Sequence, residues 1–278
     1  MRRVAFVILI FIFFSASCFA QELTVMSFNI RYSNNHDGIN GWKFRKQWIA
    51  DFVDFQDTDI VGFQEVMDDM YPELQSLMPG YSSIHMPSDT GKPNGEYEAV
   101  SIFYKKENLK LLDSGTFWLS ETPEKPSKGW DAIYNRICTW GKFQHSNSGK
   151  TFYLFNTHLS HVGENARRNA SQVILDKIKN IAKGQPVVLC GDFNTKPDSP
   201  TYNYITSALI DSRKIAKKVY APNYTGTPFE WPVKDNNIID YIFINDKLEV
   251  AKFAAYAEQR LHTKISDHLP LLVNLKIK

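Results

Sequence analysis

One segment joins an apolar run to a carboxylate and a carboxamide that stand two residues apart: VVLCGDFNTKPDSP, residues 187–200. Residues i and i+2 of a strand face the same side, so Asp192 and Asn194 could both point at one ligand atom. Gly-Asp and Asn are equally typical of a turn. The segment by itself therefore leaves a turn and a ligand site as open interpretations.

Five other apolar runs carry polar residues of the same kinds at or near one end. They hold Asn29 in LTVMSFNIR, Glu65 in DIVGFQEV, His158 in FYLFNTHLSH, Asp240 in NIIDYIFI, and Asp267 with His268 in SDHLPLLV. Each has an ordinary explanation, such as a turn for an Asn or a helix cap for Glu65. Asp240 is harder to explain, because a carboxylate among apolar neighbours must be paired or hydrogen-bonded. We take convergence of these ends as a hypothesis.

If the ends converge, they assemble carboxylates, two histidines and two carboxamides without a cysteine. Hard oxygen ligands select Mg²⁺, Mn²⁺ or Ca²⁺ over zinc. Such a metal beside an Asp and His set suits attack of water on a phosphorus ester. The chain has no Gly-x-Ser-x-Gly elbow, no P-loop and no dinucleotide-binding glycine fingerprint, so a serine hydrolase and the common nucleotide-binding classes are disfavoured.

The elements that must position these residues are short strands mixed with two clear helices. Apolar runs predict strands at 23–30, 59–63, 99–104, 137–143, 151–156, 186–190, 239–244 and 269–276. Apolar residues at helical spacing predict helices within 42–56 and 163–184, the second ending at Gly184. This mixture predicts an α/β fold in which two sheets face each other with helices outside.

Residues 1–20 have the pattern of a secretory signal peptide. The charged MRR precedes an apolar run of eleven residues, which is too short to span a bilayer, and SASCFAQ offers cleavage after Ala20. We therefore predict a signal peptide at 1–20, one domain at 21–278, and a secreted or periplasmic protein. Lipidation of Cys18 as a membrane anchor is the alternative.

Net charge limits the possible partners of the predicted mature chain, and the cysteines indicate whether it forms a disulfide. Residues 1–20 hold Arg2 and Arg3 and no acid, so the rest of the chain has 30 Lys and Arg against 30 Asp and Glu. A net charge of zero argues against tight, phosphate-driven binding to nucleic acid. Cys138 and Cys190 lie in apolar runs, which predicts two buried free thiols rather than a disulfide.

The motifs MSFNIR, GFQEV, NTHLSH, GDFN, DYIF and SDHLP occur in this order from residue 26 to residue 270. This series resembles the endonuclease/exonuclease/phosphatase superfamily, which includes pancreatic deoxyribonuclease, abasic-site endonucleases, neutral sphingomyelinases and inositol-polyphosphate 5-phosphatases. SGTFWLSETP, KGWDA and RICTWGKF resemble an uncharacterised, commonly exported bacterial branch. The resemblance implies a four-layered α/β sandwich with its site at one edge of two stacked sheets.

The resemblance also implies which residues handle the metal and the attacking water. Glu65 would be the principal metal ligand, with Asn29 beside it or at a second metal position and Asp267 as a further carboxylate. Asp192 would orient or deprotonate the water, and Asn194 would hold the scissile phosphate. The implied cofactor is Mg²⁺ or Mn²⁺, with Ca²⁺ as another possibility.

Further roles implied by the resemblance fall on histidines and their partners. His268, held by Asp240, would stabilise the charge of the phosphorane or act as the base. His158 would contact phosphate and donate a proton to the leaving oxygen. Arg136 is interpreted either as a phosphate contact or as a surface strand residue. Glu98 would orient His158.

Two assignments near these histidines stay open. Glu96 competes with Glu98 for the position beside His158. His161 either joins the site or begins the following helix.

The predicted function is an exported, metal-dependent phosphoric ester hydrolase, with a phosphodiester favoured over a phosphomonoester. The substrate could be a nucleic acid, a nucleotide, a phospholipid or an inositol phosphate, and we expect a monomer without a stable protein partner. A non-catalytic protein that binds glycans or phospholipids on the same scaffold is one alternative, and a sphingomyelinase-like lipid hydrolase is another. A carbohydrate-active enzyme with an acid pair explains the carboxylates but not the histidines and carboxamides.

Overall fold

The structure is a computed structural model that describes residues 23–89, 98–229 and 237–278. The predicted signal peptide with Cys18, and Glu96 near the predicted site, lie outside these residues. Among the residues described, no helix is both long and apolar enough to cross a membrane.

The first sheet is mixed and has seven strands. Their bounds are β1 Leu23–Asn29, β2 Ile60–Val66, β3 Tyr81–Ile84, β4 Ala99–Lys105, β10 Lys218–Tyr220, β12 Leu248–Ala255 and β15 Leu271–Ile277. Their spatial order is β10-β12-β15-β1-β2-β4-β3. The central strand β1 runs parallel to β2 and antiparallel to β15, so the first and last strands of the domain lie side by side.

The second sheet has six strands and carries the GDFN and NTH motifs. Its strands are β5 Leu109–Trp118, β6 Ile137–His145, β7 Thr151–His158, β8 Val187–Asp192, β9 Ile210–Asp211 and β11 Asp240–Ile244, in the spatial order β5-β6-β7-β8-β11-β9. A small separate hairpin pairs β13 Gln259–Arg260 with β14 Thr263–Lys264.

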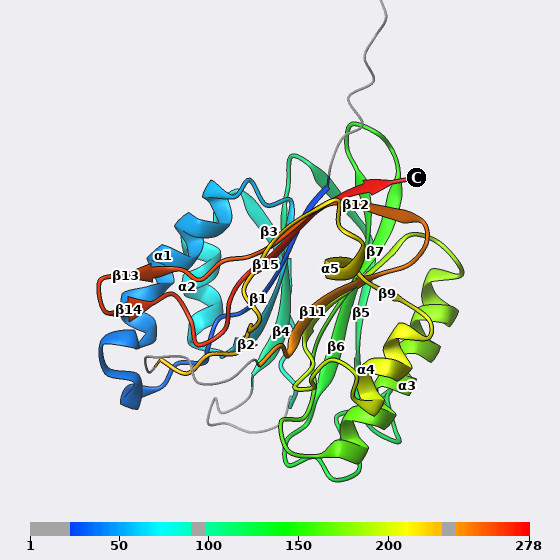
Figure 1. Cartoon of the computed structure of the whole chain (residues 1–278), viewed down its shortest axis with the longest axis horizontal. Coiled ribbons are helices and arrows are strands. Elements are labelled where there is room, and N and C mark those ends of the chain that lie inside the picture. The colour runs from blue at the N-terminus through cyan, green and yellow to red at the C-terminus, as the bar shows by residue number, and fades with distance from the viewer. Residues whose placement is uncertain (1–22, 90–97, 230–236) are drawn as a thin grey trace, which may run out of the picture.

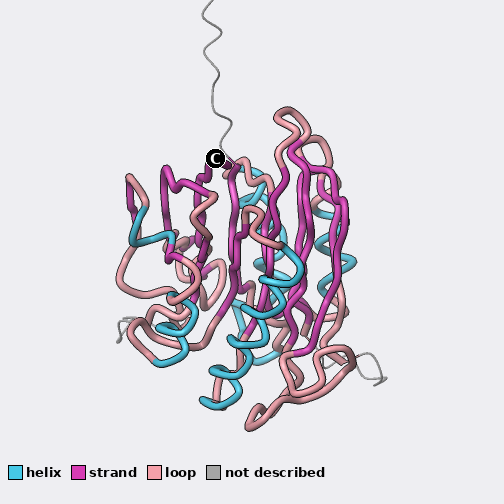
Figure 2. The backbone as a smooth tube through the Cα atoms, turned by 90° about the vertical axis from the view of Figure 1, so that its right-hand side faces the viewer, coloured by secondary structure: helices cyan, strands magenta, loops and turns pink. Residues whose placement is uncertain are grey.

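Helices cover the outer faces of both sheets. The α-helices are α1 Trp42–Phe55, α2 Met70–Leu77, α3 Glu164–Ala182, α4 Pro200–Thr206 and α5 Ser212–Ile215, and a 3-10 helix, η1, spans Asn35–Asn40. Figure 1 shows α1 and α2 beside the first sheet and α3 and α4 beside the second. Figure 2 looks from the α3 side and shows helices crossing in front of the strands. The four layers confirm the predicted α/β sandwich.

Three large apolar cores hold these layers together. Between the sheets, Val25 and Ile60 pack in one cluster with Phe152, Leu154 and Val188. Two further cores join the first sheet to α1 and α2, and the second sheet to α3 and α4. Because both faces of each sheet are covered, strands such as β8 are buried at every residue, which explains their continuous apolar sequence.

The eight predicted strands all occur, with ends shifted by a few residues. Both predicted helices occur as α1 and α3, although α3 ends at Ala182 because Lys183 adopts a left-handed conformation as its cap. The sequence predictions omit strands such as β5 and β12. β5 contains Asp113, Ser114 and Gly115 and a register shift against β6, so pairing with a neighbour, rather than its own pattern, makes it a strand. The prediction of buried free thiols at Cys138 and Cys190 is confirmed.

His85, which follows β3, is a half-buried histidine outside the predicted site. Its ring stacks on Tyr71 with centroids 3.8 Å apart, and its Nδ1 lies 2.8 Å from Ser101 Oγ. Burial lowers the pKa of His85 to about 4, although Asp68 opposes the shift. The unfolded chain binds this proton with the ordinary pKa of 6.5. Below pH 6.5 the unfolded chain binds a proton at His85 that the folded chain does not. The contribution of His85 to the free energy of unfolding is therefore fully present above pH 6.5 and is lost as the pH falls toward 4.

We expect His85→Gln to weaken the acid sensitivity of folding. Between pH 7 and pH 5, the free energy of unfolding of the wild type should fall by about 2 kcal/mol more than that of the variant. Urea unfolding at the two pH values measures this difference, with His262→Gln at an exposed histidine as the matched control. Equal pH dependence of His85→Gln and wild type would show that the pKa of His85 is the same in the folded and unfolded chains.

Candidate active site

The register of the second sheet places three predicted site residues in one row. His158 at the end of β7 pairs with Asp192 at the end of β8, and Asp192 pairs with Asp240 at the start of β11. Neighbouring strands lie about 5 Å apart, so these side chains come together although they are far apart in the sequence. All three are buried.

Gly191 allows this row to form, because the backbones of β7 and β8 approach closely there. Its φ is 148°, and a Cβ atom on it would lie 2.0 Å from the carbonyl oxygen of Thr157. A side chain at this position would both strain the backbone and push β8 away from β7. The glycine of the GDFN motif therefore sets the position of Asp192.

We expect Gly191→Ala to lower the free energy of unfolding by at least about 3 kcal/mol, because overpacking against backbone adds to the strain at positive φ. Chemical denaturation measures this loss. Gly80→Ala is the control, since a Cβ at Gly80 meets no atom within 4 Å, and its effect should stay below about 1 kcal/mol. Similar stability of the two variants would contradict the proposed requirement for glycine.

Asn194 reaches the site through a turn rather than along the strand. β8 ends at Asp192, and Asn194 has a left-handed φ of 48°. The backbone N–H of Asn194 donates to Asp192 Oδ1 at 2.9 Å, and its Nδ2 lies 3.1 Å from His158 Nε2. The segment therefore forms a turn, and the turn brings Asn194 beside Asp192. The expectation that strand alternation aligns the two residues is wrong, because the strand ends too early.

The first sheet contributes the opposite side of the site through β1 and β2. Asn29 ends β1 and pairs with Gln64 of β2. At Glu65 the pairing of β2 with β4 shifts register between Phe63 and Val66, and Glu65 has a left-handed φ of 63°. The bulge turns the Glu65 side chain toward the second sheet. Backbone strain of this kind is typical of functional positions.

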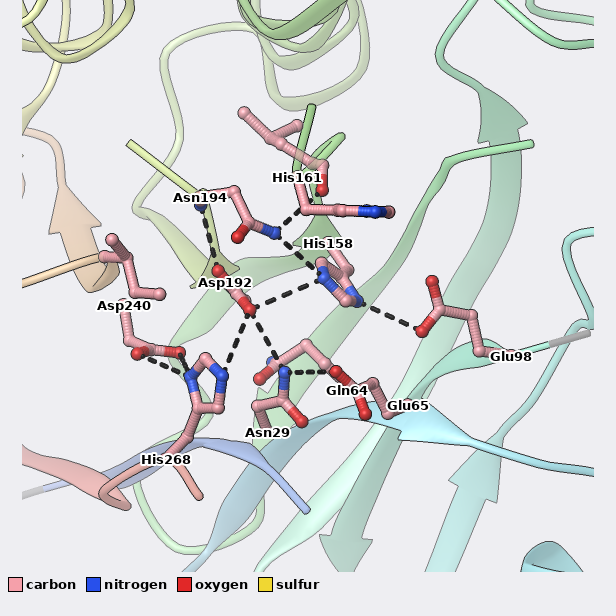
Figure 3. A network of polar contacts seen from close by, with 12 residues as sticks. Asn29, Gln64, Glu65, Glu98, His158, His161, Asp192, Asn194, Asp240 and His268 are labelled. Atoms are coloured by element: carbon pink, nitrogen blue, oxygen red, sulfur yellow. Dashed lines mark hydrogen bonds and ion pairs between the residues drawn. The ribbon is translucent and has the colours of Figure 1, made fainter. Parts of the chain in front are cut away.

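Asn29 connects the two sheets by bonding both carboxylates. Its Nδ2 donates to Glu65 Oε1 at 2.9 Å and to Asp192 Oδ2 at 3.0 Å, and its Oδ1 accepts from the backbone of Arg31 at 3.0 Å (Figure 3). Glu65 also accepts the backbone N–H of Tyr32. It does not cap α2, whose N-cap is Asp69. Burial opposes ionisation of Glu65, but the two nearby histidines and the Asn29 amide lower its pKa.

His268 and Asp240 form the histidine–carboxylate pair that the resemblance implies. His268 Nδ1 lies 2.9 Å and 3.1 Å from the two oxygens of Asp240, and His268 Nε2 lies 3.7 Å from Asp192 Oδ2. Burial opposes protonation, but the charges of Asp240 and Asp192 raise the pKa of His268 well above its ordinary value. The pair therefore favours an imidazolium that faces Asp192.

His158 lies on the other side of Asp192 and is neutral. Its Nε2 is 3.4 Å from Asp192 Oδ2, and its Nδ1 is 3.2 Å from Glu98 Oε2. Burial and the charge of Arg136 lower the pKa of His158 to about 4. Because Nε2 accepts from the Asn194 amide, the ring proton is on Nδ1, toward Glu98. The structure thus brings Glu98 beside His158, as the resemblance implies.

Arg136 is buried beneath the site, so its interpretation as a surface residue is wrong. It forms an ion pair with Glu98, and its Nη2 lies 3.4 Å from His161 Nδ1. A cavity of about 620 Å³ opens above these residues and is lined by Glu65, His158, His161, Asp192, Asn194, Asp267 and His268, among others. His161 therefore joins the site, and α3 begins three residues later at Glu164.

The donor set fits a hard divalent cation. Oxygen or nitrogen atoms of Glu65, His158 and Asp192 lie within 4.8 Å of one another, as do those of Asp192, Asp240 and His268. Burial, together with the charge of Glu65, raises the pKa of Asp267, and a cation beside these two carboxylates would relieve that repulsion. Asn29 donates to carboxylates through its nitrogen, so it supports the site from behind rather than facing a metal.

Sequence reasoning missed Arg31 and Tyr32, which line the same cavity. Arg31 pairs with Asp37 at 3.1 Å and lies 3.5 Å from Asp267, and its guanidinium stacks over Tyr32 at 4.3 Å. Arg31 is the last residue of the MSFNIR motif, and this position was the sequence signal that could have identified it as a site residue. Its left-handed φ of 58° turns the chain out of β1 into the wall of the site.

Two stacked sheets that gather carboxylates and histidines at one shared edge define the class of α/β-sandwich hydrolases that act on phosphate esters. The chain matches the family model of the Endonuclease/Exonuclease/phosphatase family over residues 26–268 and belongs to that family.

Solved bacterial structures resemble the whole domain. A family protein from Bacteroides vulgatus superposes with a TM-score of 0.88 at 38% identity, covering 93% of this chain and 100% of its own. A mannosyl-6-phosphatase from Bacteroides thetaiotaomicron superposes with a TM-score of 0.84 at 35% identity, covering 91% of this chain and 99% of its own.

More distant sequence relatives include the 3'-5'-exoribonuclease subunit Ccr4 of the CCR4-Not complex from Aspergillus niger. It is 23% identical and covers 87% of this chain. The chain spans about half or less of the length of this fungal protein and of the plant and animal relatives, between 37% and 52%.

Proposed function

We propose that this protein is an exported, divalent-metal-dependent hydrolase that cleaves a phosphate ester by in-line attack of water. The observation that carries the proposal is the position of Asp192 Oδ2. It accepts from Asn29 at 3.0 Å and lies 3.4 Å from His158 Nε2 and 3.7 Å from His268 Nε2. A carboxylate that is fixed by Asn29 and the Asn194 N–H and lies between two imidazoles is placed to orient a water and accept its proton.

Glu65 and Asp267 are the residues that would hold the metal, and Mg²⁺ or Mn²⁺ suits their oxygen donors. When bound, such an ion would neutralise charge on the phosphate oxygens. The Tyr32 N–H and the Asn29 amide fix both oxygens of Glu65. This arrangement keeps the carboxylate aimed at the cavity before substrate enters.

Protein groups supply the remaining parts of the reaction. Asp192 takes a proton from the attacking water. At the same time the water oxygen bonds to phosphorus, and the ester P–O bond breaks. The His268 imidazolium, held by Asp240, stabilises the added negative charge on the phosphoryl oxygens. The leaving oxygen takes a proton from solvent, and the products are an alcohol and the phosphate.

His158 and Asn194 act together on the phosphate. The pKa of about 4 leaves the ring of His158 neutral at neutral pH, with its proton on Nδ1, so Nε2 has no proton to give to the leaving oxygen. We therefore propose that its Nε2 and the Leu159 carbonyl hold the Asn194 amide at 3.1 Å each, and that a substrate phosphate replaces one of these two acceptors. Arg136 stays behind this pair in its ion pair with Glu98, where it fixes the Glu98 carboxylate against His158.

The charge of the cavity wall favours a small substrate over a nucleic acid polymer. The arginines among the described lining residues, Arg31 and Arg136, are both paired with carboxylates. A polymer would need several further cations for its other phosphates. The 35% identity to the mannosyl-6-phosphatase over most of both chains supports a phosphate monoester. A phosphodiester, which the sequence favours, is the second candidate, supported by the Ccr4 exoribonuclease relative.

Export rests on residues 1–20, whose charged start, apolar run and small residues before a cleavage point after Ala20 have the pattern of a signal peptide. Fractionating cells that express the full chain, and determining the N-terminal residue of the exported form, tests this. A form that begins at Gln21 supports cleavage after Ala20. A lipid-modified N-terminus at Cys18 would support the anchored alternative instead.

A hydrolysis screen on residues 21–278 tests the activity. We expect turnover of sugar phosphates or p-nitrophenyl phosphate with Mg²⁺ or Mn²⁺, and loss of turnover with EDTA. Faster cleavage of bis-p-nitrophenyl phosphate, RNA or DNA would move the assignment to the phosphodiester. Absence of turnover across monoesters, diesters, sphingomyelin and inositol phosphates, with each metal supplied, would overturn the proposal in favour of a binding protein.

A further inference from the structure

An aromatic pair stands at the mouth of the cavity without a role in the chemistry described above. The rings of Tyr134 and His161 stack with centroids 6.0 Å apart at 26°, and both residues line the cavity. Tyr134 is 57% exposed and leaves most of its ring free. Ile133 and Val162, their neighbours in sequence, are also exposed, at 51% and 53%. An exposed apolar surface beside a reaction site commonly marks a ligand contact.

The two loops that carry this pair are firmly anchored. Asp131, three residues before Tyr134, accepts the backbone N–H of Ala166 at 2.6 Å and that of Asn165 at 3.3 Å at the start of α3. On the second loop, Arg167 Nη1 donates to the carbonyl of Ser160 at 2.8 Å. The aromatic pair is therefore preorganised, which lowers the entropy lost when a ligand contacts it.

Arg136 fixes which nitrogen of His161 carries the proton. Its Nη2 lies 3.4 Å from His161 Nδ1, and a guanidinium can only donate. His161 Nδ1 is therefore the acceptor, and the proton of the neutral ring is on Nε2. His161 thus offers an N–H donor at the cavity wall, backed by the face of Tyr134.

The direction of attack on the phosphate determines which part of a substrate the pair can contact. Figure 3 shows His268 and His158 on opposite sides of Asp192, with His161 on the His158 side. If water attacks from the Asp192 and His268 side, in-line displacement directs the ester oxygen toward His158 and the surface above it. The part of the substrate attached to that oxygen then meets His161 and Tyr134.

We propose that Tyr134 and His161 form a leaving-group subsite that selects phosphate monoesters of ring sugars over acyclic alcohols. The Tyr134 ring contacts the C–H face of the pyranose, and His161 Nε2–H donates to a ring hydroxyl. This inference rests on the proposed function, because it assumes that the cavity binds a phosphate ester. It names the substrate class as a phosphorylated hexose.

The test compares mannose 6-phosphate with glycerol 3-phosphate, two primary phosphate monoesters that differ in the ring. We expect Tyr134→Ala and His161→Ala each to lower the ratio of kcat/KM for mannose 6-phosphate to kcat/KM for glycerol 3-phosphate by about tenfold. A change of this size corresponds to the loss of one packed aromatic face or of one hydrogen bond. Tyr134→Phe keeps the ring and should keep the ratio. Tyr220→Ala, at an exposed tyrosine on β10, is the matched control.

Equal losses for both substrates would overturn the subsite and show that the pair only supports Arg136. Absence of any loss for either substrate would overturn it as well. A binding measurement separates this inference from the proposed function: calorimetric titration of mannose 6-phosphate and glycerol 3-phosphate in EDTA requires no turnover. Ring-dependent binding that weakens about tenfold in Tyr134→Ala would support the subsite even in an inactive protein. No preference of the wild type for the hexose would overturn it even in an active one.

Discussion

Replacing Asp192 with asparagine is expected to lower kcat for phosphate-ester hydrolysis by about 10³-fold while the protein stays folded. The substitution keeps the shape of the side chain and removes the charge that would accept a proton from water. It also places an amide near Asn29 Nδ2, which donates to Asp192 Oδ2 at 3.0 Å. Steady-state kinetics with saturating Mg²⁺ or Mn²⁺, together with circular dichroism, measures both parts of the expectation.

Asp246→Asn is the control for this variant, because Asp246 is an exposed aspartate on the turn before β12 with a side chain that is 73% accessible. Its activity should match that of the wild type. If Asp192→Asn keeps kcat within tenfold of the wild type, Asp192 is not the group that activates water. In that case His268 becomes the base, which is the other role that the resemblance allows.

Asp240→Asn is expected to move the alkaline limb of the pH profile to lower pH by at least about one unit and to lower kcat by about 10²-fold. Asp240 raises the pKa of His268, so the wild type keeps the imidazolium well above pH 6.5 and loses activity only as the pH rises through the raised pKa. Without the Asp240 charge, His268 loses its proton at lower pH. Profiles of kcat/KM against pH for both proteins show the shift.

Asp211→Asn is the matched control, because Asp211 is another buried aspartate whose carboxylate accepts a hydrogen bond, here from Tyr202 at 2.9 Å. It lies outside the lining of the cavity, so its removal should leave the pH profile unchanged. A wild-type rate that increases through the alkaline range would contradict the imidazolium role. That outcome would identify neutral His268 as the base.

Local sequence patterns predicted much of the architecture of this protein. The apolar runs specify eight of the strands, and the helical spacing specifies α1 and α3, because burial on both faces leaves a strong local signal. The order of the motifs identifies the family without any structure. The residue types at the strand ends also indicate oxygen-rich metal and phosphate chemistry.

Edge elements and short helices carry weaker signals, and the structure was needed to find them. β5 contains three consecutive polar or small residues, yet it pairs along its length with β6. Its conformation depends on a partner strand that lies about 30 residues away in sequence. Propensity within such a segment does not contain that information.

Only the tertiary structure brings the site residues together. The row from His158 through Asp192 to Asp240 depends on strand register, and register is a property of paired strands. The direction of Glu65 depends on a bulge against β4 with a positive φ. The sequence therefore predicted which residues form the candidate site. Their convergence was decided by pairing between distant segments, because strand register and sheet stacking are non-local interactions that no single segment encodes.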